Sequence, residues 1–239
     1  MASSQITKAE ARFAIVFLKY MHANYENQLL VSAVVAWLRQ ESGGLDRVIG
    51  NNPFNIRPGM TNIFRSGVRQ SRNGNGYFNI FPNLDAAAKA TAYLLMHGSR
   101  TYGYYVVVAA AQRAVSLKDQ KALNAQALDF LTALANSSWD AAHYGYDKKD
   151  PRTNHLVRVW LTLVDKDGMI AQALAEALAA KQKSKSKPVA KKKLPRELAA
   201  FLAKADFIDG YESMEFYAAR HKTDNTLPND ADPQGKVLA

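Results

Sequence analysis

The sequence of 239 residues contains no cysteine, which excludes disulfide bonds and thiolate metal sites. No apolar run approaches the ~20 residues that span a bilayer, so we expect no transmembrane segment. The apolar run at residues 13–18 is too short for a signal-peptide core, which predicts that the chain does not use the Sec route. The glycine-rich motifs of nucleotide-binding proteins and the H-E-x-x-H spacing of zinc enzymes are also absent, so we expect neither a cofactor nor a metal.

The charge is distributed unevenly along the chain. The net charge is +10. The hydrophobic fraction of 48% and the charged fraction of 22% are typical of a globular protein with a buried core. Residues 181–196 hold eight basic residues and no acid, whereas residues 197–239 hold eight acidic and four basic residues. Because like charges repel, we interpret residues 181–196 as a lysine-rich linker. It separates a main domain, residues 1–180, from a short helical, acidic C-terminal tail, residues 197–239.

The lysine-rich segment also has functional interpretations, namely attraction to anionic wall polymers, to membrane surfaces or to DNA. DNA binding by residues 181–196 predicts an affinity that falls steeply with salt. We favour the linker and expect no specific nucleic-acid binding, because the main domain contains no nucleic-acid motif and the tail is acidic.

The main domain is predicted to be mostly helical. Thr7 and Glu10 have the spacing of a capping box, which opens the first helix. Apolar residues at near-helical spacing predict a second helix over residues 28–40, which Gly43 and Gly44 end. Further helices are expected over residues 85–97 (capped by Asn83 and ended by Gly98), 104–115, 122–135, 153–164 and 169–180.

One β-hairpin is predicted between the second and third helices. Residues 62–68 and 76–81 have the composition of strands, and the Asn-Gly pairs between them supply the positive φ angles that a tight turn needs. The predicted fold is therefore mainly α, in the α+β class, with one small hairpin.

Glu41 is the candidate catalytic residue. It lies in the last turn of the second predicted helix, one turn after Trp37, so its carboxyl group is expected beside an indole. Partial desolvation there favours the protonated form. A carboxylic acid that keeps its proton near neutral pH can protonate the oxygen of a glycosidic bond. Gly43 and Gly44 leave room for a ligand; the alternative is that Glu41 is an ordinary solvated residue at a helix end.

Five further residues are candidates for substrate binding. The amides of Asn52 and Asn55 match the hydroxyl and N-acetyl groups of a sugar, although asparagine in turns commonly bonds its own backbone. Tyr77 lines the cleft or pairs across the hairpin, and Trp139 faces the groove or is buried. His143 lies near the groove or serves a capping or packing role.

The order of these features resembles the lysozyme-like domains of bacterial and phage cell-wall lysins. The motif stands here as Trp37, Glu41-Ser42-Gly43-Gly44 and Asn52-Pro53-Phe54-Asn55. Residues 51–56 are also similar to the Asn-Asn-Leu-Phe-Gly-Ile turn of peptidoglycan N-acetylglucosaminidases. Later pieces extend the resemblance over residues 8–146: Tyr77-Phe78 before Phe81, the helix over residues 84–95, Ser137-Ser138-Trp139 and Ala142-His143-Tyr144-Gly145.

The resemblance implies cleavage of the β-1,4-linked glycan strands of peptidoglycan, with Glu41 as general acid. The enzyme is then a muramidase, a glucosaminidase or a lytic transglycosylase. A retaining hydrolase needs a second carboxylate about 5 Å away and an inverting one needs it at about 6.5–9.5 Å. Asp46 and Asp140 are the candidates for this base or nucleophile. Without either, Glu41 acts alone and the substrate's own hydroxyl closes an anhydro ring, which is lytic transglycosylation.

We expect a phage lysin, present in the virion or in the host cytoplasm before release, that acts on the bacterial cell wall. The alternative is a virion structural protein whose lysozyme-like domain binds the wall or assembles with other tail proteins and has little or no catalysis. Residues 181–239 motivate this alternative, because a basic segment followed by an acidic tail resembles an assembly handle for other virion proteins.

Overall fold

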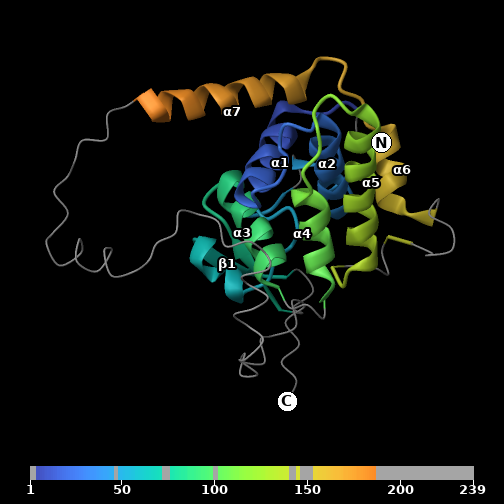
Figure 1. The fold of residues 1–239 in the computed structure, drawn as a ribbon. Coiled ribbons are helices and arrows are strands. Elements are labelled where there is room, and N and C mark those ends of the chain that lie inside the picture. The colour runs from blue at the N-terminus through green and yellow to red at the C-terminus, as the bar shows by residue number, and fades with distance from the viewer. Residues whose placement is uncertain are drawn as a thin grey trace, which may run out of the picture.

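The computed structural model describes residues 4–45, 48–71, 76–98, 102–139, 144–145 and 153–186. For residues 181–186 it describes the backbone alone. In these ranges the chain forms seven α-helices and one antiparallel hairpin (Figure 1), which confirms the mainly helical fold predicted from the sequence. The elements are α1 (Lys8–Tyr20), α2 (Gln28–Ser42), the 3-10 helix η2 (Met60–Phe64), β1 (Gly67–Gln70), β2 (Tyr77–Ile80), α3 (Leu84–His97), α4 (Tyr104–Gln112), α5 (Gln120–Asn136), α6 (His155–Thr162) and α7 (Met169–Ser186).

Helix α2 is the central element of the bundle. Its sequence is almost continuously apolar, and every residue from Leu30 to Leu38 is buried. A helix that is apolar on all sides is stable only when other elements surround it. Helices α1, α5 and α6 pack against α2, while α3 and α7 pack against α1 (Figure 1). The C-terminal end of α2 is therefore a rigid support for the side chains that it carries.

Local hydrogen bonds fix the ends of the first two helices, and the sequence predicted two of these features, the Thr7–Glu10 capping box and the stop at Gly43. At the start of α1, Thr7 N–H donates to the Glu10 carboxylate at 2.9 Å, and Glu10 N–H donates to the Thr7 hydroxyl at 3.3 Å. Asn27 caps α2 by accepting from two backbone N–H groups of its first turn. Helix α2 ends at Gly43, whose φ of +71° lies in the left-handed region that favours glycine.

Two predicted boundaries are wrong. Residues 62–64, predicted as the start of the first strand, belong to η2, because Asn62 Oδ1 accepts from Gly59 N–H and Asn62 O accepts from Arg65 N–H to close a tight turn. The last helix, predicted to end at residue 180, continues as α7 to Ser186, since lysine and glutamine are good helix formers. It thereby covers the first six residues of the expected linker. The rest of the linker and the predicted helical tail lie outside the described residues.

Tertiary contacts shorten two other helices relative to the prediction. Helix α4 ends early because Gln126 of α5 donates from Nε2 to the carbonyls of Ala111 at 3.0 Å and Arg113 at 2.8 Å. Helix α6 ends early because Val164 leaves the helix and pairs with Gln5 in a parallel bridge. No helix in the described part of the chain is long and apolar enough to cross a membrane.

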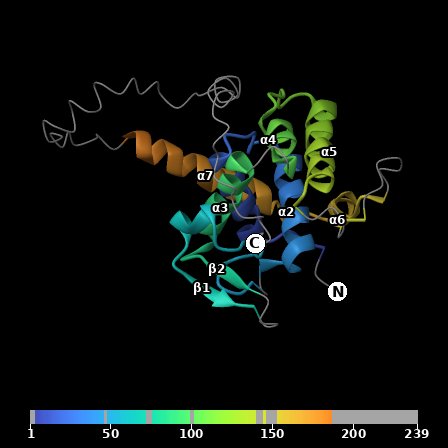
Figure 2. The same cartoon turned by 90° about the horizontal axis from the view of Figure 1, so that it is seen from below.

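The loop after α2 lies beside the hairpin. Strands β1 and β2 pair antiparallel. The loop that follows α2 runs along the other edge of β2, because Asn79 N–H donates to Ile56 O and Phe81 N–H donates to Gly50 O, both at 2.9 Å. The hairpin is thereby joined to the C-terminal end of α2, and Figure 2 shows it beside the helical bundle.

Candidate functional site

Glu41 lies in the last turn of α2 and is partly buried. Because successive helical residues are 100° apart, Arg39 projects from nearly the opposite side of the helix. Arg39 instead binds Glu10: its Nε donates to Oε1 at 2.8 Å and its Nη2 donates to Oε2 at 2.7 Å. No lysine or arginine in the described part of the chain forms an ion pair with Glu41. Its carboxyl group is therefore not held in a structural salt bridge there.

A buried tyrosine from the other half of the chain reaches Glu41. The Trp37 indole N–H donates to the Tyr144 hydroxyl oxygen at 2.9 Å, and the Tyr144 hydroxyl donates to Glu41 Oε1. The direction is fixed, because an indole N–H can only donate and the tyrosine hydroxyl has one proton to give. Tyr144 is 1% exposed and Trp37 is fully buried. The hydrogen-bonded chain Trp37–Tyr144–Glu41 therefore begins and ends on α2.

Burial raises the pKa of Glu41 above its ordinary value, and it is the largest influence on this group. Hydrogen bonding from Tyr144, Trp139 and Trp37 lowers the pKa, because it stabilises the carboxylate, but does not cancel the effect of burial. Glu41 thus keeps its proton to higher pH than an exposed glutamate does. Burial, and then the nearby Glu41 carboxylate, also raise the pKa of Tyr144, so its hydroxyl remains a donor.

An aromatic cluster explains why this end of α2 is poorly solvated. The Trp37 ring centroid lies 4.2 Å from that of Phe54 and 5.0 Å from that of Trp139. The Phe54 and Trp139 centroids are 5.8 Å apart. Trp37 and Phe54 are buried, whereas Trp139 is partly exposed. The structure thus brings the predicted residues Glu41 and Trp139 together, with Phe54 of the asparagine-rich loop beside them.

The start of α6 holds Tyr144 in place. Tyr144 O accepts from His155 N–H at 2.9 Å. Gly145 has a φ of +55°, and a Cβ at this position would lie 2.8 Å from His155 Nε2, so only glycine fits here. Asn154 caps α6 and donates from Nδ2 to Leu131 O of α5 at 3.4 Å. These contacts fix the tyrosine through two helices.

Three other predicted ligand-binding residues lie in the described part of the chain: Asn52 is buried, whereas Asn55 and Tyr77 are exposed. Asn52 is 2% exposed; its Nδ2 donates to Ile56 O and Asn79 O at 2.8 and 2.9 Å, and its Oδ1 accepts from Ile56 N–H at 2.9 Å. These bonds correspond to the turn-forming alternative for Asn52. Asn55 is exposed with a φ of +52°, and Tyr77 at the start of β2 is 54% exposed. Both are accessible to a ligand.

Asp46, Asp140 and His143 lie outside the described residues, so their roles stay predictions. Tyr144 is not among the site residues predicted from the sequence. The available signal was its place in the piece 142–145, one of the pieces on which the expected resemblance to cell-wall lysins rests. In the described part of the chain, no three histidine, aspartate or glutamate side chains gather where they could hold a metal ion.

Comparisons of the chain with protein-family models, with curated proteins and with solved structures found no match. The class that the structure itself defines is a mainly helical protein with one hairpin and a half-buried acid at the end of its central helix.

Proposed function

We propose that this protein cleaves the glycan strands of peptidoglycan with Glu41 as the general acid. The observation that carries the proposal is the state of the Glu41 carboxyl group. It is partly buried, it has no cationic partner among the described residues, burial raises its pKa, and Tyr144 occupies one of its two oxygens. The resemblance to cell-wall lysins through Glu41, its glycine turn and the asparagine-rich loop supplies the substrate class.

In the proposed reaction the two oxygens of Glu41 have separate roles. Because Oε1 accepts from Tyr144, Oε2 carries the acid proton. This proton passes to the glycosidic oxygen as the bond between that oxygen and the anomeric carbon breaks, and the leaving sugar departs as an alcohol. Glu41 becomes a carboxylate, so the hydrogen bond from Tyr144 becomes charge-assisted and strengthens as the negative charge develops.

The possible products differ in the nucleophile that attacks the anomeric carbon. With Asp46 or Asp140 as base, water attacks and the strand is hydrolysed. With Glu41 alone, the carboxylate removes a proton from a hydroxyl of the substrate, and this oxygen closes an anhydro ring. The protonation step is common to both routes, so the proposal covers a muramidase, a glucosaminidase and a lytic transglycosylase.

The first test is whether purified peptidoglycan is a substrate. We expect the wild-type protein to clear a suspension of isolated murein and to release soluble glycan fragments. The rate should fall as the pH rises through the raised pKa of Glu41, because the acid then loses its proton. Intact murein after prolonged incubation across acid and neutral pH, with the protein folded by circular dichroism, would exclude the proposal.

Replacement of Tyr144 by phenylalanine tests the hydrogen bond to Glu41. A hydrogen bond to a charged group contributes about 1.5–3 kcal/mol, so the cleavage rate should fall by about 10- to 100-fold. The alkaline limb of the pH–rate profile should move to higher pH, because the lost bond stabilises the Glu41 carboxylate and lowers its pKa. Trp37 Nε1 also loses its acceptor, which destabilises the fold by about 1–3 kcal/mol.

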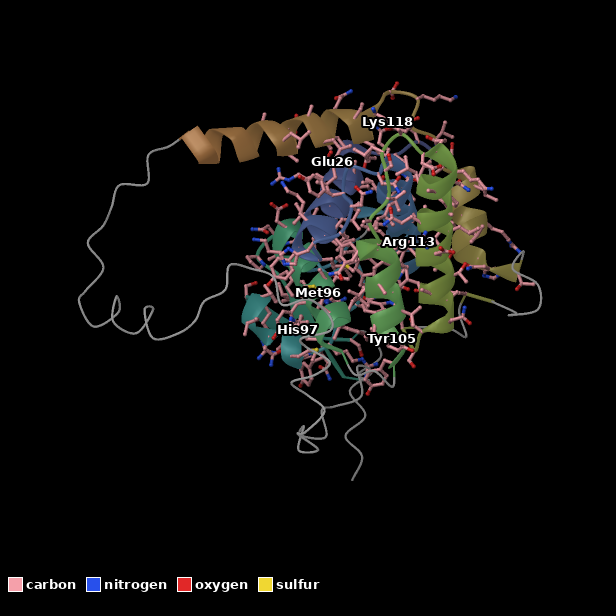
Figure 3. The ribbon with its side chains drawn as sticks, viewed as in Figure 1. Glu26, Met96, His97, Tyr105, Arg113 and Lys118 are labelled. Carbon is pink, nitrogen blue, oxygen red and sulfur yellow. The ribbon has the colours of Figure 1, made fainter. Side chains whose placement is uncertain are left out.

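The matched control is Tyr105→Phe, which removes the hydroxyl of an exposed tyrosine on α4 (Figure 3). This variant should retain the wild-type rate and pH profile. An unchanged alkaline limb in Tyr144→Phe, measured well below its unfolding temperature, would show that the tyrosine does not act on Glu41.

A further inference from the structure

The hairpin and its adjoining loop form a basic, acid-free lobe. Residues 48–84 contain four arginines and no aspartate or glutamate. Three of these arginines, Arg57, Arg65 and Arg69, are described, and all are partly exposed. None of them forms an ion pair with a carboxylate in the described part of the chain. The described carboxylates therefore do not neutralise the charge of these three arginines.

Two of these arginines are held on one face of the hairpin. Arg69 of β1 stands directly opposite Phe78 of β2, so the two side chains share a face, and the Arg69 guanidinium carbon lies 4.9 Å from the ring centroid. Arg57 approaches from the loop on the other edge of β2, with its guanidinium carbon 5.7 Å from the same centroid. The ring of Phe78 on β2 thus contacts two guanidinium groups, one from the loop and one from β1.

The contact with Phe78 organises the two cations before any ligand arrives. Cation–π contact restricts each guanidinium group, which reduces the entropy that a ligand must remove on binding. Arg69 Nε is buried and donates no hydrogen bond. A planar guanidinium group binds a carboxylate through two parallel hydrogen bonds, so a pair of fixed arginines suits a ligand with several carboxylates.

The lobe is coupled to the candidate site through the loop after α2. Ile56, the residue before Arg57, bonds to β2, and Phe54 in the same loop stacks on Trp37 with a centroid distance of 4.2 Å. Trp37 lies one turn before Glu41 on α2. The loop that carries Arg57 is therefore anchored to the same end of α2 as Glu41.

We propose that Arg57 and Arg69 bind the carboxylates of the stem peptides on the glycan strand, so that the protein prefers peptide-bearing strands to bare glycan. This inference rests on the proposed function, which supplies the strand as ligand. Each stem peptide carries several carboxylates, which suit two arginines, whereas each muramic acid of the glycan has a single lactyl carboxyl group, which the amide bond to the peptide neutralises.

The experiment compares peptide-bearing glycan strands with the same strands after an amidase has removed the peptides. Binding is measured with Glu41→Gln to prevent turnover, and cleavage is measured with wild-type Glu41. We expect R57Q/R69Q to weaken binding and raise KM about tenfold for peptide-bearing strands. The change should be smaller for bare strands, because each of their muramic acids presents one lactyl carboxylate in place of the several carboxylates of a stem peptide. R57K/R69K should recover part of the loss, since lysine keeps the charge but not the bidentate geometry.

The charge-matched control is K118Q/K121Q. Lys118 lies in the loop between α4 and α5, at the end of the molecule away from the hairpin (Figure 3), and Lys121 is an exposed residue of α5. This double variant also loses two positive charges, and it should keep the wild-type preference for peptide-bearing strands. If the two double variants weaken binding equally, the loss is due to net charge alone, and the assignment of Arg57 and Arg69 as the binding residues is overturned.

The outcomes separate this inference from the proposed function. Equal binding of the two kinds of strand by the protein with both arginines intact overturns the inference, even if the strands are cleaved and even if R57Q/R69Q fails to fold. Preferential binding without cleavage by wild type supports the inference and excludes the proposed function. If the protein binds phosphatidylglycerol vesicles more tightly than strands, and this binding depends on Arg57 and Arg69, the lobe is a membrane-binding surface and the inference is overturned.

Discussion

Replacement of Glu41 by glutamine is expected to slow murein cleavage by roughly 10²- to 10⁴-fold, the contribution of a positioned general acid. Glutamine has the same shape and still accepts the hydrogen bond from Tyr144, but it has no proton to transfer. The matched control is Glu26→Gln, in the loop before α2 at the opposite end of that helix (Figure 3). Glu26 is exposed, so its replacement should leave the rate within about twofold of wild type, as for most surface substitutions.

The same Glu41→Gln variant should be more stable than wild type at neutral pH. The folded state raises the pKa of Glu41, so the protonated form is favoured and stability is lost as the pH rises through the raised value. Glutamine carries no charge to desolvate, so we expect a gain of about 0.5–2 kcal/mol, or a few degrees in Tm. The difference in Tm between variant and wild type should be small near pH 4 and widen toward pH 8. A variant less stable than wild type throughout would show that the carboxyl group is structural.

Replacement of Arg39 by methionine should give the largest loss of stability. It leaves the Glu10 carboxylate buried without its cation, which typically costs about 3–5 kcal/mol. At about 2–4 °C per kcal/mol for a chain of this size, Tm should fall by roughly 6–20 °C. The control is Arg12→Met, which breaks the exposed pair of Arg12 with Asp85 and should cost at most about 1 kcal/mol. Similar losses in the two variants would contradict the structural role of the buried pair.

The stability that the Glu10–Arg39 pair contributes depends on pH in the opposite direction to the contribution of Glu41. Burial alone would raise the pKa of Glu10, but its hydrogen bonds with Arg39 and Thr7 and the charge of Arg39 outweigh it, and the pKa is lowered. The stability from this pair is therefore present above the ordinary glutamate pKa and lost as the pH falls through the lowered value. Thermal unfolding of the wild type and Arg39→Met should converge at acid pH. The double variant E10Q/R39M should regain part of the lost stability, because no unpaired charge remains buried.

Features set by neighbouring residues were predictable from the sequence. The Thr7 capping box and the Gly43 stop depend on side chains and backbone angles within one helical turn, and both are observed. The spacing of Trp37 and Glu41 on one helix likewise predicted a carboxyl group next to an indole, and burial does raise the pKa of Glu41.

Features set by distant residues were not predictable. Tyr144 hydrogen-bonds Trp37 and Glu41 across more than 100 residues, and nothing in its local sequence indicates that contact. The pairing of Glu10 with Arg39 joins two helices, so a capping residue also acts as a buried counter-ion. Asn52 fits the composition of a sugar-binding turn, but its amide bonds three backbone groups, two of Ile56 in the same loop and one of Asn79 in β2.

Mass spectrometry of the soluble fragments released from purified murein by wild type, Glu41→Gln and Glu26→Gln tests the central claim most directly. We predict that wild type and Glu26→Gln release the same fragments, each with a new reducing or anhydro sugar end, and that Glu41→Gln releases almost none. Equal release of such fragments by Glu41→Gln, or release of fragments cut only within the peptides, would contradict the account.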